Sequence, residues 1–495
     1  MGSTVEPYAC CLVESLRAFG YSFEAAVADI IDNSIYAGAK TINIDFDWNG
    51  ADTIFSITDN GCGMDSSELV NAMRPGTKSP VEKRNEKDLG RFGLGLKTAS
   101  FSQCRKLIVA SKKNNSCSVK AWDLDEVCKK NEWYLLDEGD IPNVDYYLKN
   151  LTGICSGTTV FWENIDRACM DLEANSDKHH SKFLELIEHL GFHLRLTFHR
   201  FLEQKNGPSI ILNGRKILPW DPFMSSHKAT QSKKCHIDYK NIHITPIVYI
   251  LPHHSKLSEE EYKIGQGVRG WNDYQGFYVY RNKRLLIAGD WLGLGGAKEE
   301  HAKLARIQID LPNTLDHDWQ IDVKKSKASP PAILKEELKN IAQKARGEAT
   351  QIYRHRGKIL NRSESPNNIV CIWNRIKRQG KYHFKLNLEY PIISKMLNSL
   401  PSNLKKDFRA ILRLVGETVP SPAIAVTHSE EPDAIGKPYS GCLKELTMLG
   451  VSLYSEMQKA GNSRKNILRK LATLEPFDSY PELIDMIEQE VKHVK

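Results

Sequence analysis

Three short segments constrain this 495-residue chain more than any other feature of its sequence. They are Asp29–Ser34, Asp59–Met64 and Gly90–Lys97, and they follow one another within the first hundred residues. The first lies in an apolar-rich helical stretch, the second follows an alternating strand, and the third places glycines ahead of a helix. Together they predict a nucleotide pocket built from a helix, a strand end and a glycine-rich lid.

The first segment supplies the candidate catalytic chemistry. Asp29 and Asn33 are four residues apart, so a helix presents them on one face. Asn33 would give an oxygen to Mg²⁺, which accepts few protein ligands and keeps phosphate and water ligands. Asp29 would orient or deprotonate the water that attacks a γ-phosphate.

The other two segments supply candidate binding groups. Asp59 ends a strand, where its carboxylate can accept a hydrogen bond from an exocyclic amine such as that of adenine. Glycines permit a tight turn and a close approach of the backbone to the base. A lysine near the glycine-rich loop adds positive charge, and the polar stretch before the loop is a candidate lid. The predicted cofactor-binding residues of these segments are Asn33, Asp59, Gly61, Gly63, Met64, Thr77, Lys78, Gly90, Gly93, Leu94, Gly95, Leu96 and Lys97.

The positive charge of the chain is concentrated near its C-terminal part. The net charge is +7, and residues 351–385 alone hold nine basic residues against one acidic residue, with aromatic residues interleaved. Such a stretch can follow a phosphate backbone, or it can be an ordinary solvated surface, and composition leaves both open.

Periodicity predicts a mixed α/β protein of two or three domains. Helices are expected over residues 7–20, 23–36, 182–202 and 331–354, and the strands over 42–46, 53–58, 107–111, 118–122, 158–162, 242–250 and 277–280. An Asn213-Gly214 hairpin is expected to open a second strand-rich region. His189 and His193 lie in a helical stretch and are interpreted as packing or capping residues.

No apolar run is long enough for a membrane span, and the start of the sequence lacks the pattern of a secretory signal. The 11 cysteines are scattered, which favours reduced thiols. A cytoplasmic protein is therefore expected, with no membrane partner.

The three segments resemble the N, G1 and G2 boxes of the GHKL ATPase superfamily, which includes gyrase, MutL, the heat-shock chaperone ATPases and histidine kinases. The longer stretch SLRAFGYSFEAAVADIIDNSIYAGA looks most like the bacterial branch related to MutL and MORC. Gly157-Thr158 resembles a later Gly-Thr of the family, whose threonine supports the adenine-binding aspartate. The resemblance covers roughly residues 7–345.

The resemblance implies an α+β fold in three parts. Residues 1–204 would form a GHKL (Bergerat) α/β sandwich ATPase domain, 205–350 a ribosomal-S5-like β-α transducer domain, and 351–495 a basic, mainly helical C-terminal region. It also implies that a transducer lysine reaches the γ-phosphate. Lys325 is favoured for this catalytic role, and Lys324 and Lys327 stay open.

The family implies ATP and Mg²⁺ as cofactors and an ATP-dependent homodimer that acts as a clamp, and the basic C-terminal region suggests that double-stranded DNA is what it clamps. The family further implies a role in bacterial restriction or anti-phage defence, with a partner nuclease or helicase. The family usually has Glu where Asp29 stands, so slow hydrolysis is expected, and it often has Asp where Tyr36 stands. The alternatives are a chaperone-like clamp on protein clients and an ATP-sensing module without turnover; a histidine kinase is disfavoured because no histidine precedes Asp29.

Overall fold

The computed structural model describes residues 7–18, 20–76, 95–322, 325, 327–354, 370–378, 381–420, 423–424, 439 and 441–493. The chain divides into two compact units, Met1–Gly357 and Lys358–Lys495. Its mixture of sheets and helices is the α+β class that the sequence predicts. The predicted division of the first unit near residue 204 stays a prediction.

The first unit contains a seven-stranded sheet with the strand order β4-β3-β5-β2-β1-β6-β7. Neighbouring strands are antiparallel except β1 and β6. The strands are β1 (Thr41–Asp47), β2 (Ile54–Asp59), β3 (Lys106–Lys113), β4 (Ser116–Asp123), β5 (Gly157–Glu163), β6 (Ser209–Leu212) and β7 (Arg215–Lys216). The associated helices are α1 (Ala9–Arg17), α2 (Phe23–Tyr36), α3 (Ser66–Met73), α4 (Gly95–Phe101), α5 (Leu124–Lys130), α6 (Val144–Leu148), α7 (Asp177–Thr197) and α8 (His199–Leu202).

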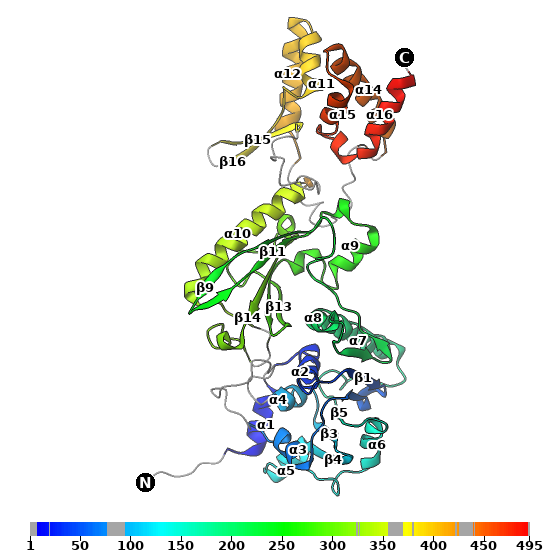
Figure 1. The fold of residues 1–495 in the computed structure, drawn as a ribbon, viewed down its shortest axis with the longest axis vertical. Helices are drawn as coiled ribbons and strands as arrows, with labels where there is room; N and C mark the ends of the chain where they lie inside the picture. The colour runs from blue at the N-terminus through cyan, green and yellow to red at the C-terminus, as the bar shows by residue number, and fades with distance from the viewer. Residues whose placement is uncertain are drawn as a thin grey trace. The chain divides into compact units, whose positions relative to one another are not determined.

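Alternation along β3 shows how this sheet is covered on both faces. Leu107 and Val109 join the large core beneath α1, α2, α4 and α7, while Ile108 and Ala110 join a smaller core against α6. Successive side chains of a strand point to opposite faces, so a strand with both faces covered reads as a continuous apolar run. The large helix layer on one face matches the prediction, and α6 on the other face is an addition to it (Figure 1).

The Asn213-Gly214 hairpin forms as predicted but belongs to a different sheet. Both residues have positive φ values, 44° and 74°, as a two-residue hairpin turn requires. The sequence pattern predicted that this hairpin belongs to the second strand-rich region. Instead β6 pairs with β1 in parallel, from Thr41–Ser209 to Ile44–Leu212, and so extends the first sheet. Strand partners are tertiary contacts, which local patterns do not specify.

A second sheet of the same unit has the order β13-β12-β14-β11-β8. Helix α10 packs against its β11 and β14 strands (Figure 1). The region expected as one strand over 242–250 is two strands, one in a separate pair with β9. The elements are β8 (Gln231–Lys234), β9 (Ile237–Tyr239), β10 (Ile242–Ile244), β11 (Ile247–Ile250), α9 (Glu259–Gln266), β12 (Gly276–Arg281), β13 (Arg284–Asp290), β14 (Ala305–Leu311) and α10 (Ala332–Arg354).

The second unit is mainly helical, as predicted. It also contains the β15–β16 hairpin, which was not predicted from the sequence. Its core is formed by Tyr390, Leu446, Phe477 and neighbouring apolar residues. The elements are β15 (Trp373–Arg378), β16 (Lys381–Leu386), α11 (Pro391–Ser399), α12 (Ser402–Glu417), α14 (Leu443–Lys459), α15 (Arg464–Leu471) and α16 (Pro481–His493).

Among the helices that the structure describes, none combines the length and apolar content needed to cross a bilayer. Cys10 and Cys128 form a disulfide that joins α1 to the end of α5, which differs from the expectation of reduced thiols for this pair. The other nine cysteines are free.

Candidate nucleotide site

Helix α2 positions the first group of site residues. Ser22 caps it by accepting a hydrogen bond from the Ala25 N–H at 3.3 Å. Ala26, Val27, Ile30 and Ile31 of the helix are buried in the large core. Asp29 lies within this buried stretch and is only 3% exposed. Asn33, one turn later, is exposed, so the carboxylate is enclosed while the amide faces open space.

The buried carboxylate of Asp29 is surrounded by donors. The Tyr21 hydroxyl donates to Oδ2 at 3.0 Å, and the Lys325 ammonium donates to Oδ1 at 3.1 Å. Burial raises the pKa of Asp29, and the charges of Lys325 and Arg284 oppose that rise. These donors hold the carboxylate in one orientation, and the nearby cations favour its ionised form.

Arg284 is a site residue that the sequence analysis missed. It begins β13, is 4% exposed, and its Nε donates to both oxygens of Asp32 at 3.1 and 2.8 Å. Its Nη2 lies 3.5 Å from Asp29 Oδ1. Asp32 is 2% exposed, and its ion pair with Arg284 links helix α2 to strand β13 of the second sheet. The buried partner of Arg284 lies 252 positions earlier in the chain and gives no local sequence signal.

Lys325 comes from the loop after the second sheet and reaches the same helix. Its ammonium lies 2.5 Å from Asp32 Oδ2 as well as 3.1 Å from Asp29 Oδ1. Its backbone has φ +53°, a left-handed conformation that an L side chain adopts at a cost of about 1 kcal/mol. Of the three lysines left open by the sequence, Lys325 contacts the acidic pair and Lys327 lines a neighbouring cleft, while Lys324 lies outside the described residues.

Asp59 ends β2 in a second buried polar cluster. Gly61 donates its N–H to Oδ1 at 2.8 Å, and the Ser34 hydroxyl donates to Oδ2 at 2.8 Å. Burial raises the pKa of Asp59, and hydrogen bonds from Gly61, Ser34 and the Thr158 backbone oppose that rise. Ser34 was part of the first segment but was not predicted as a site residue. These donors leave the carboxylate oriented as a fixed acceptor.

Thr158 lies opposite Asp59 across the β2–β5 ladder, and its role in supporting an adenine-binding aspartate stays a prediction. Its hydroxyl is 2.9 Å from the Ser111 hydroxyl, and Ser111 also accepts the Met64 N–H at 2.8 Å. Thr158 thus connects the strand end at Asp59 to the Met64 turn through Ser111.

The two glycines of the second segment are required by packing within the protein. An added Cβ on Gly63 would lie 1.9 Å from the Lys112 carbonyl oxygen, and φ there is +63°. An added Cβ on Gly61 would lie 2.8 Å from the Ala37 Cβ. The predicted reason, a close approach to the base, is therefore not needed to explain them.

The third segment is described from Gly95 onward. A Cβ on Gly95 would lie 3.9 Å from Asp29 Oδ2, so the start of α4 adjoins the acidic helix. Leu96 packs against the large core. Lys97 is 3% exposed and donates to the Ala72 carbonyl at 2.9 Å, at the end of α3, and burial lowers its pKa to about 8. Its predicted contact with a phosphate stays a prediction. Thr77, Lys78, Gly90, Gly93 and Leu94 lie outside the described residues.

The described site thus combines a buried acid on a helix, a fixed aspartate at a strand end and a lysine from the loop after the second sheet. Residues 21–158 match the family model described as "Histidine kinase-, DNA gyrase B-, and HSP90-like ATPase". This part of the chain is therefore similar to the ATPase domains of the GHKL proteins.

Curated relatives match over short stretches of this chain. The chain is 30% identical to "ATPase morc-1" of Caenorhabditis elegans over 90 residues, which are 18% of this chain and 10% of that protein. It is 39% identical to "DNA mismatch repair protein MutL" of Clostridium acetobutylicum over 59 residues, 12% of this chain and 9% of that protein. It is 34% identical to "ATPase MORC2B" of Mus musculus over 97 residues, 19% of this chain and 9% of that protein. The matches thus span about a tenth of the length of each relative.

Proposed function

We propose that this protein binds ATP with Mg²⁺, hydrolyses it slowly, and acts as an ATP-gated dimeric clamp on DNA. The observation that supports it most is the meeting of Asp29 on α2 with Lys325 from the loop beyond the second sheet. Two parts of the first unit each contribute one charged group to one place, so a ligand bound there would link them.

In the proposed reaction, water attacks the γ-phosphorus, the bond to the bridging oxygen breaks, and ADP leaves with phosphate as the second product. Asp29 takes the proton of the attacking water as general base. Lys325 exchanges its carboxylate partners for the γ-phosphate oxygens, which frees Asp29 to face the water and stabilises the charge that develops on the transferred group.

Asp59 and Asn33 serve binding in this proposal. Asp59 accepts the exocyclic amine of adenine, because its oxygens are already aimed by Gly61 and Ser34. The exposed amide of Asn33 makes no hydrogen bond with the described part of the chain, so its oxygen fits a place in the Mg²⁺ shell. Mg²⁺ when bound supplies charge neutralisation on the phosphates.

We attribute the slow ATP hydrolysis to the short side chain of Asp29 and to the contacts that already hold its carboxylate. Aspartate is one methylene shorter than glutamate, and here it is also held by Tyr21, Lys325 and Arg284. Both features reduce the fraction of time in which a water is well placed, and a misplacement of about 1 Å can lower a rate by about a hundredfold.

The experiment that tests hydrolysis compares phosphate release and ATP binding by wild type, Asp29→Ala and Asp59→Asn. We expect Asp29→Ala to retain Mg²⁺-dependent ATP binding and lose phosphate release, while Asp59→Asn loses binding. Equal background release in wild type and Asp29→Ala, with ATP still bound, would favour an ATP-sensing module without turnover.

The clamp and its DNA are the finer parts of the proposal. The excess of basic residues over 351–385 supports a polyanionic client, and the β15–β16 ladder places Arg375 opposite Phe384 and Lys377 opposite Tyr382 in backbone register. ATP would favour the closed dimer, and loss of the γ-phosphate would reopen it. A bacterial defence role, with a partner nuclease or helicase, is proposed on resemblance.

Two measurements test the clamp. Sedimentation with a non-hydrolysable ATP analogue should show a dimer that dissociates when nucleotide is removed. Duplex DNA affinity should fall linearly with salt on logarithmic axes. Dimerisation without any DNA affinity, together with binding to unfolded protein clients, would instead support the chaperone-like clamp.

A further inference from the structure

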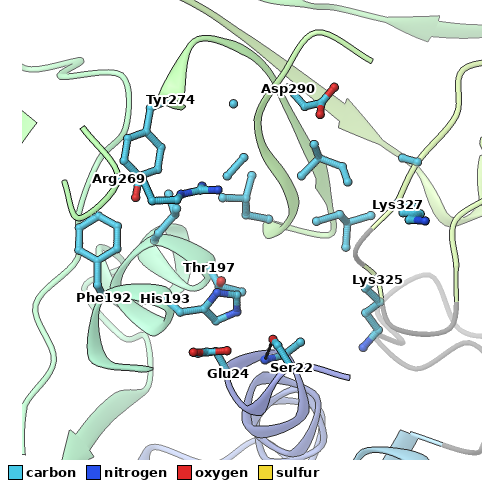
Figure 2. A pocket seen from close by; sticks show the side chains of 18 of the residues that line it. Ser22, Glu24, Phe192, His193, Thr197, Arg269, Tyr274, Asp290, Lys325 and Lys327 are labelled. Atoms are coloured by element: carbon cyan, nitrogen blue, oxygen red, sulfur yellow. Dashed lines mark hydrogen bonds between the residues drawn. The ribbon is translucent and has the colours of Figure 1, made fainter. Parts of the chain in front are cut away.

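A cleft of about 680 Å³ lies inside the first unit, beside the acidic helix, and it shares Arg284 and Lys325 with the candidate nucleotide site (Figure 2). It is lined by the first turn of α2, the C-terminal half of α7, strand β13 and the loop around Lys325 and Lys327. Asn33, Asp59 and Thr158 are absent from its lining. The cleft therefore adjoins Ser22 at the start of α2, whereas Asn33 lies near the end of that helix.

Helix α7 presents two polar groups to this cleft without a partner in the described part of the protein. Thr197 is 3% exposed, and its hydroxyl makes no hydrogen bond to any described residue. His193, one turn earlier, likewise makes none through its ring, and Figure 2 shows it beside Thr197. Burial and the charges of Arg284 and Arg269 lower the pKa of His193 to about 3, so its ring is neutral. Neither side chain is among those whose polar atoms are fully buried without a partner, so the polar atoms of both are open to a ligand in the cleft.

The cleft also carries more positive than negative charge. Its cations are Arg269, Arg284, Lys298, Lys325 and Lys327, against the carboxylates of Glu24 and Asp290. Arg284 and Lys325 are engaged by Asp29 and Asp32. Arg269 and Lys327 form no ion pair with any carboxylate that the structure describes, and so remain available to an anion.

One wall of the cleft is apolar. It is formed by Leu285–Ala288 of β13, and Phe192 and Tyr274 lie near Arg269 in Figure 2. The Arg269 guanidinium lies 4.7 Å from the Tyr274 ring centroid, which fixes the cation at the edge of this wall. A site with an apolar wall and a few converging polar groups suits a small organic molecule.

We propose that this cleft is a second ligand site, which binds a small organic anion bearing more than one phosphate or carboxylate group. The charged groups of the anion bind Arg269 and Lys327, and its hydrogen-bonding groups pair with Thr197 and His193. Its apolar part packs against β13. The site adjoins the nucleotide site, with which it shares Arg284 and Lys325, but the groups proposed to bind the anion are different, so it can be occupied whether or not ATP is bound.

Calorimetry on the full chain tests this, with inorganic pyrophosphate and citrate as probes that separate phosphate from carboxylate recognition. Each titration is run with and without a saturating non-hydrolysable ATP analogue. We expect at least one probe to bind with a Kd below about 1 mM in both conditions. Arg269→Gln, Lys327→Gln and Thr197→Val should each weaken binding, the first two by about tenfold.

Matched controls keep the result specific. Arg215→Gln and Lys233→Gln remove the same charges from exposed positions of β7 and β8 that do not line the cleft, and they should leave the affinity unchanged. The proposal is overturned if neither probe binds, if the ATP analogue abolishes binding, or if the cleft variants bind as tightly as wild type.

Occupancy of the cleft should also lower ATP turnover, because Lys325 lines the cleft and contacts Asp29. This consequence rests on the proposed ATPase activity. A saturating probe should reduce phosphate release by at least about threefold in wild type and not in Arg269→Gln, because an anion bound beside Lys325 attracts the ammonium that would otherwise stabilise the γ-phosphate. If the probe binds but the protein hydrolyses no ATP, the second ligand site is supported and only the proposed ATPase activity is contradicted.

Discussion

The Lys325 ammonium lies 3.1 Å from Asp29 Oδ1 and 2.5 Å from Asp32 Oδ2, although almost three hundred positions separate it from either residue. The lysine proposed for the γ-phosphate is thus already paired with the acid proposed as general base. The Lys325 charge therefore opposes the rise in the pKa of Asp29 that burial causes. The same contact joins the loop after the second sheet to helix α2.

Lys325→Ala should reduce phosphate release by about a hundredfold, because it removes a charge that would stabilise the transferred phosphoryl group. The acid limb of the pH–rate profile should also move to higher pH, since loss of the ammonium raises the pKa of Asp29 further. Steady-state rates between pH 5 and 9 measure both effects. Lys327→Ala is the comparison, and a larger loss in that variant would reassign the γ-phosphate lysine.

Arg284→Met should destabilise the protein by about 3 kcal/mol, because it leaves two buried carboxylates with one cation fewer. Chemical denaturation followed by tryptophan fluorescence measures the loss. Adding Asp32→Asn to Arg284→Met should recover part of it, since the unpaired charge is then removed. Arg215→Met, at an exposed position, provides the control and should stay within about 0.5 kcal/mol of wild type.

Ser34→Ala should weaken ATP binding by about fivefold, because it removes one of the donors that orient Asp59, a loss of about 1 kcal/mol. Equilibrium binding of a fluorescent ATP analogue measures this. Ser181→Ala removes a hydroxyl from the exposed face of α7 and should bind as wild type does. An unchanged affinity in Ser34→Ala would show that Gly61 and Thr158 suffice to position the carboxylate.

Gly63→Ala should cost more than about 3 kcal/mol of folding stability, because the new Cβ would overlap the Lys112 carbonyl in addition to the strain of a positive φ. Gly38→Ala is a matched control with φ +76° and no atom within 4 Å of the added Cβ, so it should show only the backbone strain of about 1 kcal/mol. Thermal unfolding without nucleotide distinguishes them. Equal losses in the two variants would remove the steric explanation for Gly63.

Lys97 should make the protein more stable as pH rises from about 8 to 10.5. Its pKa in the folded protein is lowered to about 8, so the unfolded chain binds more protons in this window and unfolding becomes harder as pH increases. The difference in unfolding free energy between wild type and Lys97→Met should change by about 3 kcal/mol across the window. A constant difference would show that Lys97 titrates normally.

The sequence alone determined the local elements and the chemistry that each segment carries. Helix α2 begins and ends where its apolar spacing predicts, and the Asn213-Gly214 turn forms because both residues tolerate positive φ. Asp29, Asn33 and Asp59 could be selected from two short segments, since the spacing within each segment is local.

The tertiary structure alone decided what those groups contact. Nothing near Arg284 in the sequence identifies Asp32 as its partner, and nothing near Ser209 shows that its strand pairs with β1. The cleft beneath His193 likewise exists only because α2, α7 and β13 meet there. Periodicity records which side of an element is buried, whereas partners distant in the chain are chosen by packing and by the need to neutralise buried charge.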